Sequence, residues 1–163
     1  MKKLKLNELK KRVQDEWGFR VIDEDFEKPW GGYFVIHPED TDKFIEIYFS
    51  EHKDKFHGKA DLSPKYLILE PGKRFSWQVH DRRAEIWRVV EGPLGAYIGE
   101  SDAMPENHQL FEVDQVLYMD QGIRHRLKGL DDWGVVAEIW VHTDAENLSD
   151  EADIRRIEDD FNR

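Results

Sequence analysis

The sequence SWQVHDRRAEIWRVVEG, residues 76–92, contains two runs that predict β-strands, joined by the short connection DRRA. Three of its side chains, Gln78, His80 and Glu85, can each ligate a metal. Successive strand residues point to opposite faces of a sheet, so Gln78 and His80 share one face. Because the connection is long enough to turn the chain, Glu85 begins a returning strand beside His80. One imidazole nitrogen and two oxygens can therefore converge on a single point inside the sheet.

The same alternation places Arg74 and Ser76 on the face of Gln78 and His80. A mixed set of nitrogen and oxygen ligands suits zinc, manganese, iron or nickel, and these residues alone do not select among them. Taken singly, each side chain is more often structural, with Gln78 as a hydrogen-bonded core amide and Glu85 as a charge at a strand edge. Together they favour a metal, because an inward glutamate costs free energy unless it is paired or metal-bound.

The chain contains seven histidines, and one of those outside this stretch could supply a fourth metal ligand. His125 is the strongest candidate because it follows a turn containing Gly122, where a further predicted strand begins at residues 124–127. His142 ends a predicted strand and could be structural or functional. The remaining histidines lie in turn-like or strongly polar segments and are expected at the surface: His37, His52, His57 and His108.

Short runs of β-branched and aromatic residues continue on both sides of this hairpin, separated by turn signals rich in Gly, Pro and Asp. The predicted strands are 33–36, 44–49, 65–69, 75–80, 85–90, 94–99, 115–119 and 134–141. No helix-length pattern interrupts them, which favours an all-β sandwich, jelly roll or barrel over a parallel α/β sheet. The polar residues 50–65 are expected to form a long connection.

Both ends of the chain carry helical patterns. An apolar repeat predicts a helix over residues 3–17, and its members are Leu6, Leu9, Val13 and Trp17. A second repeat predicts a C-terminal helix, and its members are Ile154, Ile157 and Phe161. We therefore expect a single domain over residues 1–163. It consists of an N-terminal helical extension (1–25), a β-barrel (26–143) and a C-terminal helix (144–163).

The charge composition of the chain disfavours some classes of binding partner. The chain has 163 residues, with Lys+Arg 24 against Asp+Glu 35 and a net charge of -11. This charge repels nucleic-acid phosphates and anionic lipid, so neither nucleic acid nor membrane is expected as a partner, and an anionic small substrate would need a local cluster of Arg or Lys. There is no cysteine, which excludes disulfides and thiolate metal sites. Because no signal-peptide pattern or long apolar run is present, a cytoplasmic location is expected.

Four motifs, in order along the chain, resemble the cupin domain of the mannose-6-phosphate isomerase family. The resemblance is to the small form that also ends the bifunctional mannose-6-phosphate isomerase/mannose-1-phosphate guanylyltransferases. The motifs are PWGGY (29–33), PGKRFSWQVH (71–80), RAEIW (83–87) and GIRHRL (122–127). The resemblance covers roughly residues 28–163 and implies a double-stranded β-helix, the cupin barrel. It also implies one divalent metal ion per chain, with zinc expected first and manganese, iron, cobalt or nickel also compatible. The implied ligands are Gln78, His80, Glu85 and His125.

The activity implied by this resemblance is an aldose–ketose isomerisation, from mannose 6-phosphate to fructose 6-phosphate, through an ene-diolate. A metal can stabilise this anion, a base must move the proton, and Arg or Lys must hold the phosphate. The candidates for anion binding are Arg74, on the inward face, and Arg126, beside the metal histidine; a salt bridge is the alternative role for both. Three further arginines lie on turns near the mouth and rank below them: Arg82, Arg83 and Arg124. The base is not identified, although Asp81 and Asp120 occupy suitable turns.

Two other functional classes remain open. The first is a cupin that binds a sugar or sugar phosphate without chemistry, as a sensor or accessory protein. It is favoured because Asp81, Arg82 and Ile86 stand where the family has further histidines. The second is a dioxygenase, which is disfavoured because oxygenase sites more often use histidine at the position of Gln78. A homodimer is a further expectation, since it would cover the sheet edges.

Overall fold

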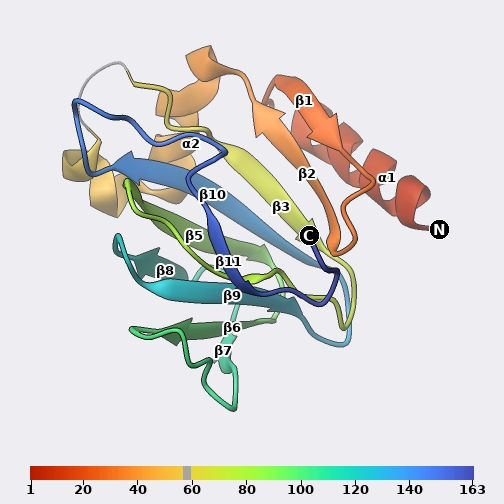
Figure 1. The fold of residues 1–163 in the computed structure, drawn as a ribbon. Coiled ribbons are helices and arrows are strands. Elements are labelled where there is room, and N and C mark those ends of the chain that lie inside the picture. The colour runs from red at the N-terminus through yellow and green to blue at the C-terminus, as the bar shows by residue number, and fades with distance from the viewer. Residues whose placement is uncertain (57–59) are drawn as a thin grey trace.

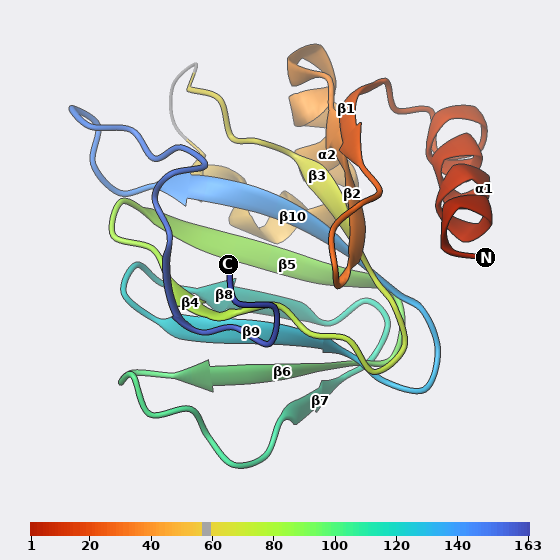
Figure 2. The ribbon, with the colours of Figure 1, turned by 45° about the vertical axis from the view of Figure 1, so that its right-hand side comes forward.

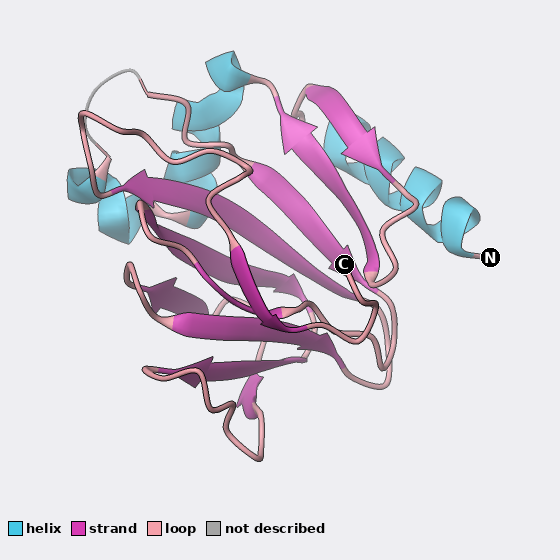
Figure 3. Cartoon of the chain, in the orientation of Figure 1, coloured by secondary structure: helices cyan, strands magenta, loops and turns pink. Residues whose placement is uncertain are grey.

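The computed structural model describes residues 1–56 and 60–163 and shows two antiparallel sheets packed face to face, with helices on the outer side of the larger sheet (Figures 1 and 3). The larger sheet contains, in spatial order, β1 (Val21–Asp25), β2 (Gly31–Ile36), β3 (Lys65–Leu69), β10 (Gly134–His142), β5 (Arg83–Glu91) and β8 (Val116–Met119). The smaller sheet contains β11 (Arg155–Glu158), β4 (Trp77–Val79), β9 (Arg124–Gly129), β6 (Leu94–Gly99) and β7 (Gln109–Phe111). The helices are α1 (Lys2–Asp15), α2 (Thr41–Tyr48) and the short 3-10 helices η1 (Pro38–Asp40) and η2 (Ser50–Lys55). The expected all-β double-stranded barrel with an N-terminal helix is confirmed.

Strand β10 illustrates why several strands read as continuous apolar runs. Val135, Ala137 and Ile139 belong to the core beneath α1 and α2, whereas Val136 belongs to the core between the two sheets. Because strand side chains alternate, the even-numbered residues that follow Val136 also face the space between the sheets. Both faces of β10 are therefore buried, so its sequence lacks a regular polar face.

Every predicted strand is present except the one at residues 44–49, where the prediction was wrong. Helix α2 covers most of this segment. Phe44, Ile45 and Tyr48 are buried, whereas Ile47 is 50% exposed. This spacing follows one face of a helix, and it competes with strand alternation in so short an apolar run.

The predicted C-terminal helix over residues 144–163 was also wrong. Strand β11 lies there instead and pairs with β4, with Arg156 opposite Gln78. Strand β4 pairs with β9 on its other side, so the tail satisfies backbone groups that would otherwise form an open sheet edge. Figure 2 shows the dark-blue tail crossing from the larger sheet to the smaller one. Since β1 joins the larger sheet as well, the strands extend beyond the expected limits of 26–143 on both sides.

The PWGGY motif shapes the start of β2. Gly31 has a φ of +150°, and a Cβ atom there would lie 1.8 Å from the carbonyl oxygen of Ile68, so only glycine fits. The preceding Trp30 packs on Phe75, with ring centroids 4.3 Å apart. This contact joins the larger sheet to the segment leading into β4. Both aromatic side chains line a cavity between the larger sheet and the C-terminal tail.

Within the described residues, none of the helices combines the length and apolar character needed to cross a bilayer. His142 is structural, because its Nε2 lies 2.6 Å from the backbone oxygen of Asp61 and its Nδ1 accepts from the backbone N–H of Ser149. His57, expected at the surface, lies outside the described residues.

Candidate metal centre

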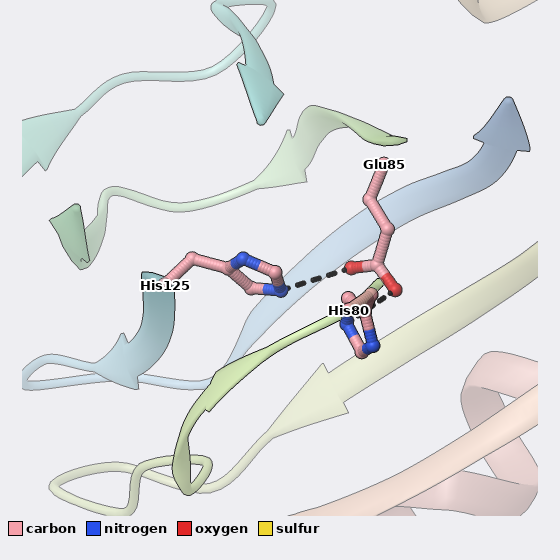
Figure 4. Close-up of side chains that lie close together, drawn as sticks. All are labelled: His80, Glu85 and His125. Atoms are coloured by element: carbon pink, nitrogen blue, oxygen red, sulfur yellow. Dashed lines mark ion pairs between the residues drawn. The ribbon is translucent and has the colours of Figure 1, made fainter. Parts of the chain in front are cut away.

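Three of the predicted ligands meet between the two sheets, and each is 1–2% exposed (Figure 4). His80 follows β4, Glu85 lies in β5 and His125 lies in β9, so both sheets contribute. Nε2 of His80 lies 3.0 Å from Oε1 of Glu85, and Nε2 of His125 lies 3.2 Å from Oε2 of Glu85. One ligand atom from each residue lies within 4.8 Å of the others, which is close enough for a single metal ion to contact all three.

The hydrogen-bond partner of Nδ1 determines which nitrogen of each histidine ring carries the proton. Nδ1 of His80 is 2.6 Å from the backbone oxygen of Asp153, and Nδ1 of His125 is 3.0 Å from that of Ile123. A carbonyl oxygen can only accept a hydrogen bond, so each Nδ1 carries the proton of the neutral ring. A neutral ring would therefore present the lone pair of Nε2 to Glu85, whereas in the metal-free protein burial lowers the pKa of His80 and the charge of Glu85 raises it above its usual value.

This arrangement fits a bound cation. Oε2 of Glu85 and Nε2 of His125 are buried and have no hydrogen-bond partner among the residues that the structure describes, although buried polar atoms normally have one. Burial alone would raise the pKa of Glu85, but His80, Arg83 and His125 hold that pKa well below its usual range. An anionic carboxylate facing two lone pairs is repelled unless a proton or a metal ion lies between them. Two imidazoles and a carboxylate are a suitable ligand set for a divalent metal.

Gln78 lies beside this group but does not present its oxygen to it. It is paired with His125 across β4 and β9, and its Nε2 lies 3.5 Å from Nε2 of His80. Its Oε1 accepts a hydrogen bond of 2.7 Å from the hydroxyl of Ser76. Turning the amide by half a rotation would direct the oxygen toward Nε2 of His80. The role of Gln78 as a fourth ligand stays a prediction.

Arg74 does not share the face of Gln78, so that part of the prediction was wrong. The backbone N–H of Phe75 donates to the oxygen of Leu127, whereas Gln78 is paired with His125, so the register between the two segments shifts by one residue. Such a shift moves the side chains before it to the other face of the sheet. The outward position of Arg74 could not be anticipated from regular alternation.

Arg126 also points away from the metal centre, because it follows His125 directly in β9. It is 0% exposed, and it donates to the backbone oxygen of Phe75 at 2.6 Å and to Oδ1 of Asp160 at 2.9 Å. Arg74 donates to the same carboxylate at 2.6 Å. Both arginines therefore anchor the C-terminal tail, in the salt-bridge role that was their alternative. Their role in binding an anion stays a prediction.

A cavity of about 380 Å³ opens beside the metal centre. Strands β2, β3 and β10 form one wall, the tail forms another, and Gln78 joins the cavity to the centre. Its cationic lining residues are Lys28, Lys65, Arg83, Arg156 and Arg163. Its acidic lining residues are Asp23, Glu138 and Glu151. In a chain with a net charge of -11, this local excess of cations suits an anionic ligand.

Arg83 links the cavity to the metal centre. It is the first residue of β5 and 5% exposed, although the sequence suggested a turn. Its Nη2 lies 2.9 Å from Oε1 of Glu85, and its Nη1 donates to Oγ of Ser149 at 2.9 Å. Its guanidinium carbon lies 3.9 Å from the ring centroid of Trp140. The RAEIW motif contains this residue, but only the sheet register reveals that it faces inward.

Sequence reasoning missed Glu138 altogether. This carboxylate is 5% exposed and lines the cavity. Its Oε2 accepts from Nε1 of Trp87 at 2.7 Å, and its Oε1 accepts from Nε1 of Trp140 at 3.3 Å. Glu138 could have been noticed as the single acidic residue within the apolar run GVVAEIWVH. A carboxylate in a buried strand costs free energy unless it is paired or hydrogen-bonded, so such a residue suggests a specific role.

The positions at which the chain departs from the resembled family lie outside this cavity. Ile86 packs in the core beneath the helices. The backbone N–H groups of Asp81 and Arg82 donate to the carboxylate of Asp153. None of the three departures is among the described residues that line the cavity. These three substitutions therefore lie outside the described cavity wall.

Solved structures provide a first comparison. The crystal structure of capsular polysaccharide assembling protein CapF from Staphylococcus aureus aligns with a TM-score of 0.57 and 13% identity, covering 86% of this chain and 35% of that chain. The structure of KdgF from Halomonas sp. aligns with a TM-score of 0.52 and 13% identity, covering 77% of this chain and 90% of that chain. The chain thus spans about a third of the CapF chain. At such low identity, these similarities establish the cupin fold alone.

Sequence comparison identifies the family. A search of curated proteins found no match. Residues 18–159, however, match the family described as "Mannose-6-phosphate isomerase C-terminal". This match covers both sheets and all four predicted ligands, in agreement with the resemblance carried by the four motifs. The chain therefore belongs to the mannose-6-phosphate isomerase C-terminal family of cupins.

Proposed function

We propose that this protein is a metal-dependent isomerase that interconverts an aldose phosphate and a ketose phosphate. Mannose 6-phosphate and fructose 6-phosphate are the first pair to test. Family membership supports a sugar-phosphate substrate, and the cations of the cavity support an anionic one. A cytoplasmic location and a homodimer stay predictions.

The observation that carries this proposal is the buried convergence of His80, Glu85 and His125, in which both imidazole Nε2 atoms face the Glu85 carboxylate. A divalent cation held by His80, Glu85 and His125, with Gln78 as a predicted fourth ligand, would supply a Lewis acid for a carbonyl or hydroxyl oxygen. Zinc is expected first, and manganese, iron, cobalt and nickel are also compatible with these ligands.

The residues of the cavity would bind and orient the substrate. Lys65 on β3 and Arg156 on β11 both line the cavity, and they can hold a phosphate group between them. Trp30 contributes an apolar wall for the C–H groups of a sugar. The contact between Arg83 and Glu85 keeps the carboxylate ionised and fixes its orientation.

A cupin that binds a sugar phosphate without chemistry is the second candidate. One observation favours it. Lys65 already pairs with Glu151 at 2.7 Å, and Arg83 already pairs with Glu85 at 2.9 Å. An incoming anion must compete with these carboxylates. Binding as a sensor or accessory protein would need only that exchange, whereas catalysis needs a proton-transfer group as well.

A coupled isomerase assay distinguishes the two candidates. The protein would be loaded in turn with zinc, manganese, cobalt and nickel, then offered mannose 6-phosphate and a panel of other aldose phosphates. We expect turnover with at least one metal, and its loss in His80→Ala. Absence of turnover across the panel, in protein with measured bound metal, would reject the isomerase and favour the binding protein.

A further inference from the structure

Glu138 lies in the cavity wall and is not one of the predicted metal ligands. On the inner face of the larger sheet it is paired with Lys65 of β3 on one side and with Trp87 of β5 on the other. The adjacent inward pair on β10 and β5 is Trp140 opposite Glu85. Glu138 is thus a diagonal neighbour of Glu85, and such neighbours are roughly 7–8 Å apart in antiparallel sheets. A substrate atom in the cavity can therefore lie between the metal centre and this carboxylate.

The surroundings of Glu138 suit proton transfer at neutral pH. In the metal-free protein, burial and the negative charge of Glu85 raise the pKa of Glu138 to about 7, and the positive charges of Lys65 and Arg83 oppose this shift. Nζ of Lys65 is 4.0 Å from Oε1 of Glu138. A general base is most effective when its pKa lies near the working pH. Glu138 can accept a proton in one step and return it in the next.

The other acidic candidates lack this combination. Asp81 and Asp120, the sequence candidates for the base, are exposed and are not among the described lining residues. Of the other acidic lining residues, Asp23 is exposed, and the side chain of Glu151 is 76% exposed. Only a buried carboxylate inside the cavity can act on a substrate from which water has been excluded.

We infer that Glu138 moves the proton between C1 and C2 of the sugar in the proposed isomerisation, and the inference rests on that proposed function. The Glu138 carboxylate removes the proton from C2 of the open-chain aldose. The electron pair of the broken C–H bond forms the C1=C2 double bond, and the carbonyl electron pair moves onto O1. The Glu138 carboxyl group then returns the proton to C1, while the O2 hydroxyl proton passes to O1 and a carbonyl forms at C2. Atoms and electrons balance without an oxidant or reductant.

The test compares Glu138→Gln, Glu138→Asp and the control Glu112→Gln, which changes an exposed carboxylate on another part of the surface. The single carbonyl oxygen of glutamine can still accept the shorter indole hydrogen bond, from Nε1 of Trp87, so the variant should fold although it loses the longer bond from Trp140. We would measure isomerisation in D2O, deuterium incorporation into the product, and the pH profile. Metal content and affinity for mannitol phosphate, which cannot isomerise, provide readouts that are independent of turnover.

We expect Glu138→Gln to lose about 10²- to 10⁴-fold in isomerisation and deuterium incorporation, as for removal of a general base. Its metal content and mannitol phosphate affinity should stay within threefold of the wild type. Glu138→Asp should keep part of the rate and the pH break near neutrality, and Glu112→Gln should match the wild type.

The inference is overturned if the wild type turns over and Glu138→Gln keeps a rate within tenfold, a result that leaves the proposed function standing. Equal losses of turnover and mannitol phosphate binding in both Glu138 variants would also overturn it, because they indicate a structural role. A wild type that neither isomerises nor exchanges protons on any substrate rejects the proposed function and this role together.

Discussion

Replacing Glu138 with glutamine should change how the stability of the metal-free protein depends on pH. The folded protein raises the pKa of Glu138 to about 7 from an ordinary value of 4.5. The difference of about 2.5 units corresponds to about 3 kcal/mol, at about 1.4 kcal/mol per unit. Because the folded pKa is the higher one, the folded protein binds this proton more tightly. The contribution is fully present below pH 4.5 and is lost as pH rises through 7.

Glutamine has no proton to lose, so Glu138→Gln should gain stability relative to the wild type by about 2–3 kcal/mol between pH 5 and pH 8. Urea unfolding of both proteins across this range, with a chelator present, measures that gain. The remaining carboxylates are common to both proteins and cancel in the difference. A difference that stays constant from pH 5 to pH 8 would refute the raised pKa, and with it the electrostatic account of the cavity. Glu112→Gln serves as the control and should show no such trend.

Three further substitutions test separate parts of the account. Arg126→Met should cost about 2–3 kcal/mol in urea unfolding, because it removes the charged hydrogen bonds to the backbone oxygen of Phe75 and to Asp160, which keeps only Arg74. It should leave metal content unchanged, and wild-type stability would contradict this. Lys65→Gln should weaken a phosphorylated ligand at least tenfold more than its unphosphorylated analogue in calorimetry, and equal losses would exclude Lys65 as a phosphate contact. Asp153→Ala should lower metal affinity about 10- to 100-fold in chelator competition. Without its carboxylate the tail is no longer fixed, and the backbone oxygen of residue 153 no longer orients His80. An unchanged affinity would show that the tail does not orient His80.

The two strands within residues 76–92 were accessible from sequence, but the expected hairpin was wrong, because β4 and β5 lie in different sheets and do not pair. His80, Glu85 and His125 do converge, but they meet across the space between the two sheets and not within one hairpin. The main strands were also accessible, since β-branched and aromatic runs between Gly and Pro turns are local signals. The strands depend only on residues close together in the chain, whereas the convergence of His125 with Glu85 depends on the packing of the two sheets.

The features that were missed depend on long-range contacts. The one-residue register shift that turns Arg74 outward arises where two distant segments pair. The tail forms β11 because the edge of β4 needs partners, which the periodicity of Ile154 and Ile157 does not reveal. In the sequence Glu138 is an isolated acidic residue. Only the pairing of β10 with its neighbouring strands shows that Lys65 and two indole groups surround it.

The central claim is that His80, Glu85 and His125 hold a divalent metal ion. The most direct measurement is the metal content of the wild type, His80→Ala and His125→Ala by mass spectrometry after dialysis against zinc, with His52→Ala as a control remote from the centre. The account predicts one ion per chain in the wild type and the control, and loss of bound metal in the other two variants. Full metal content in both His80→Ala and His125→Ala would contradict the assignment of this site.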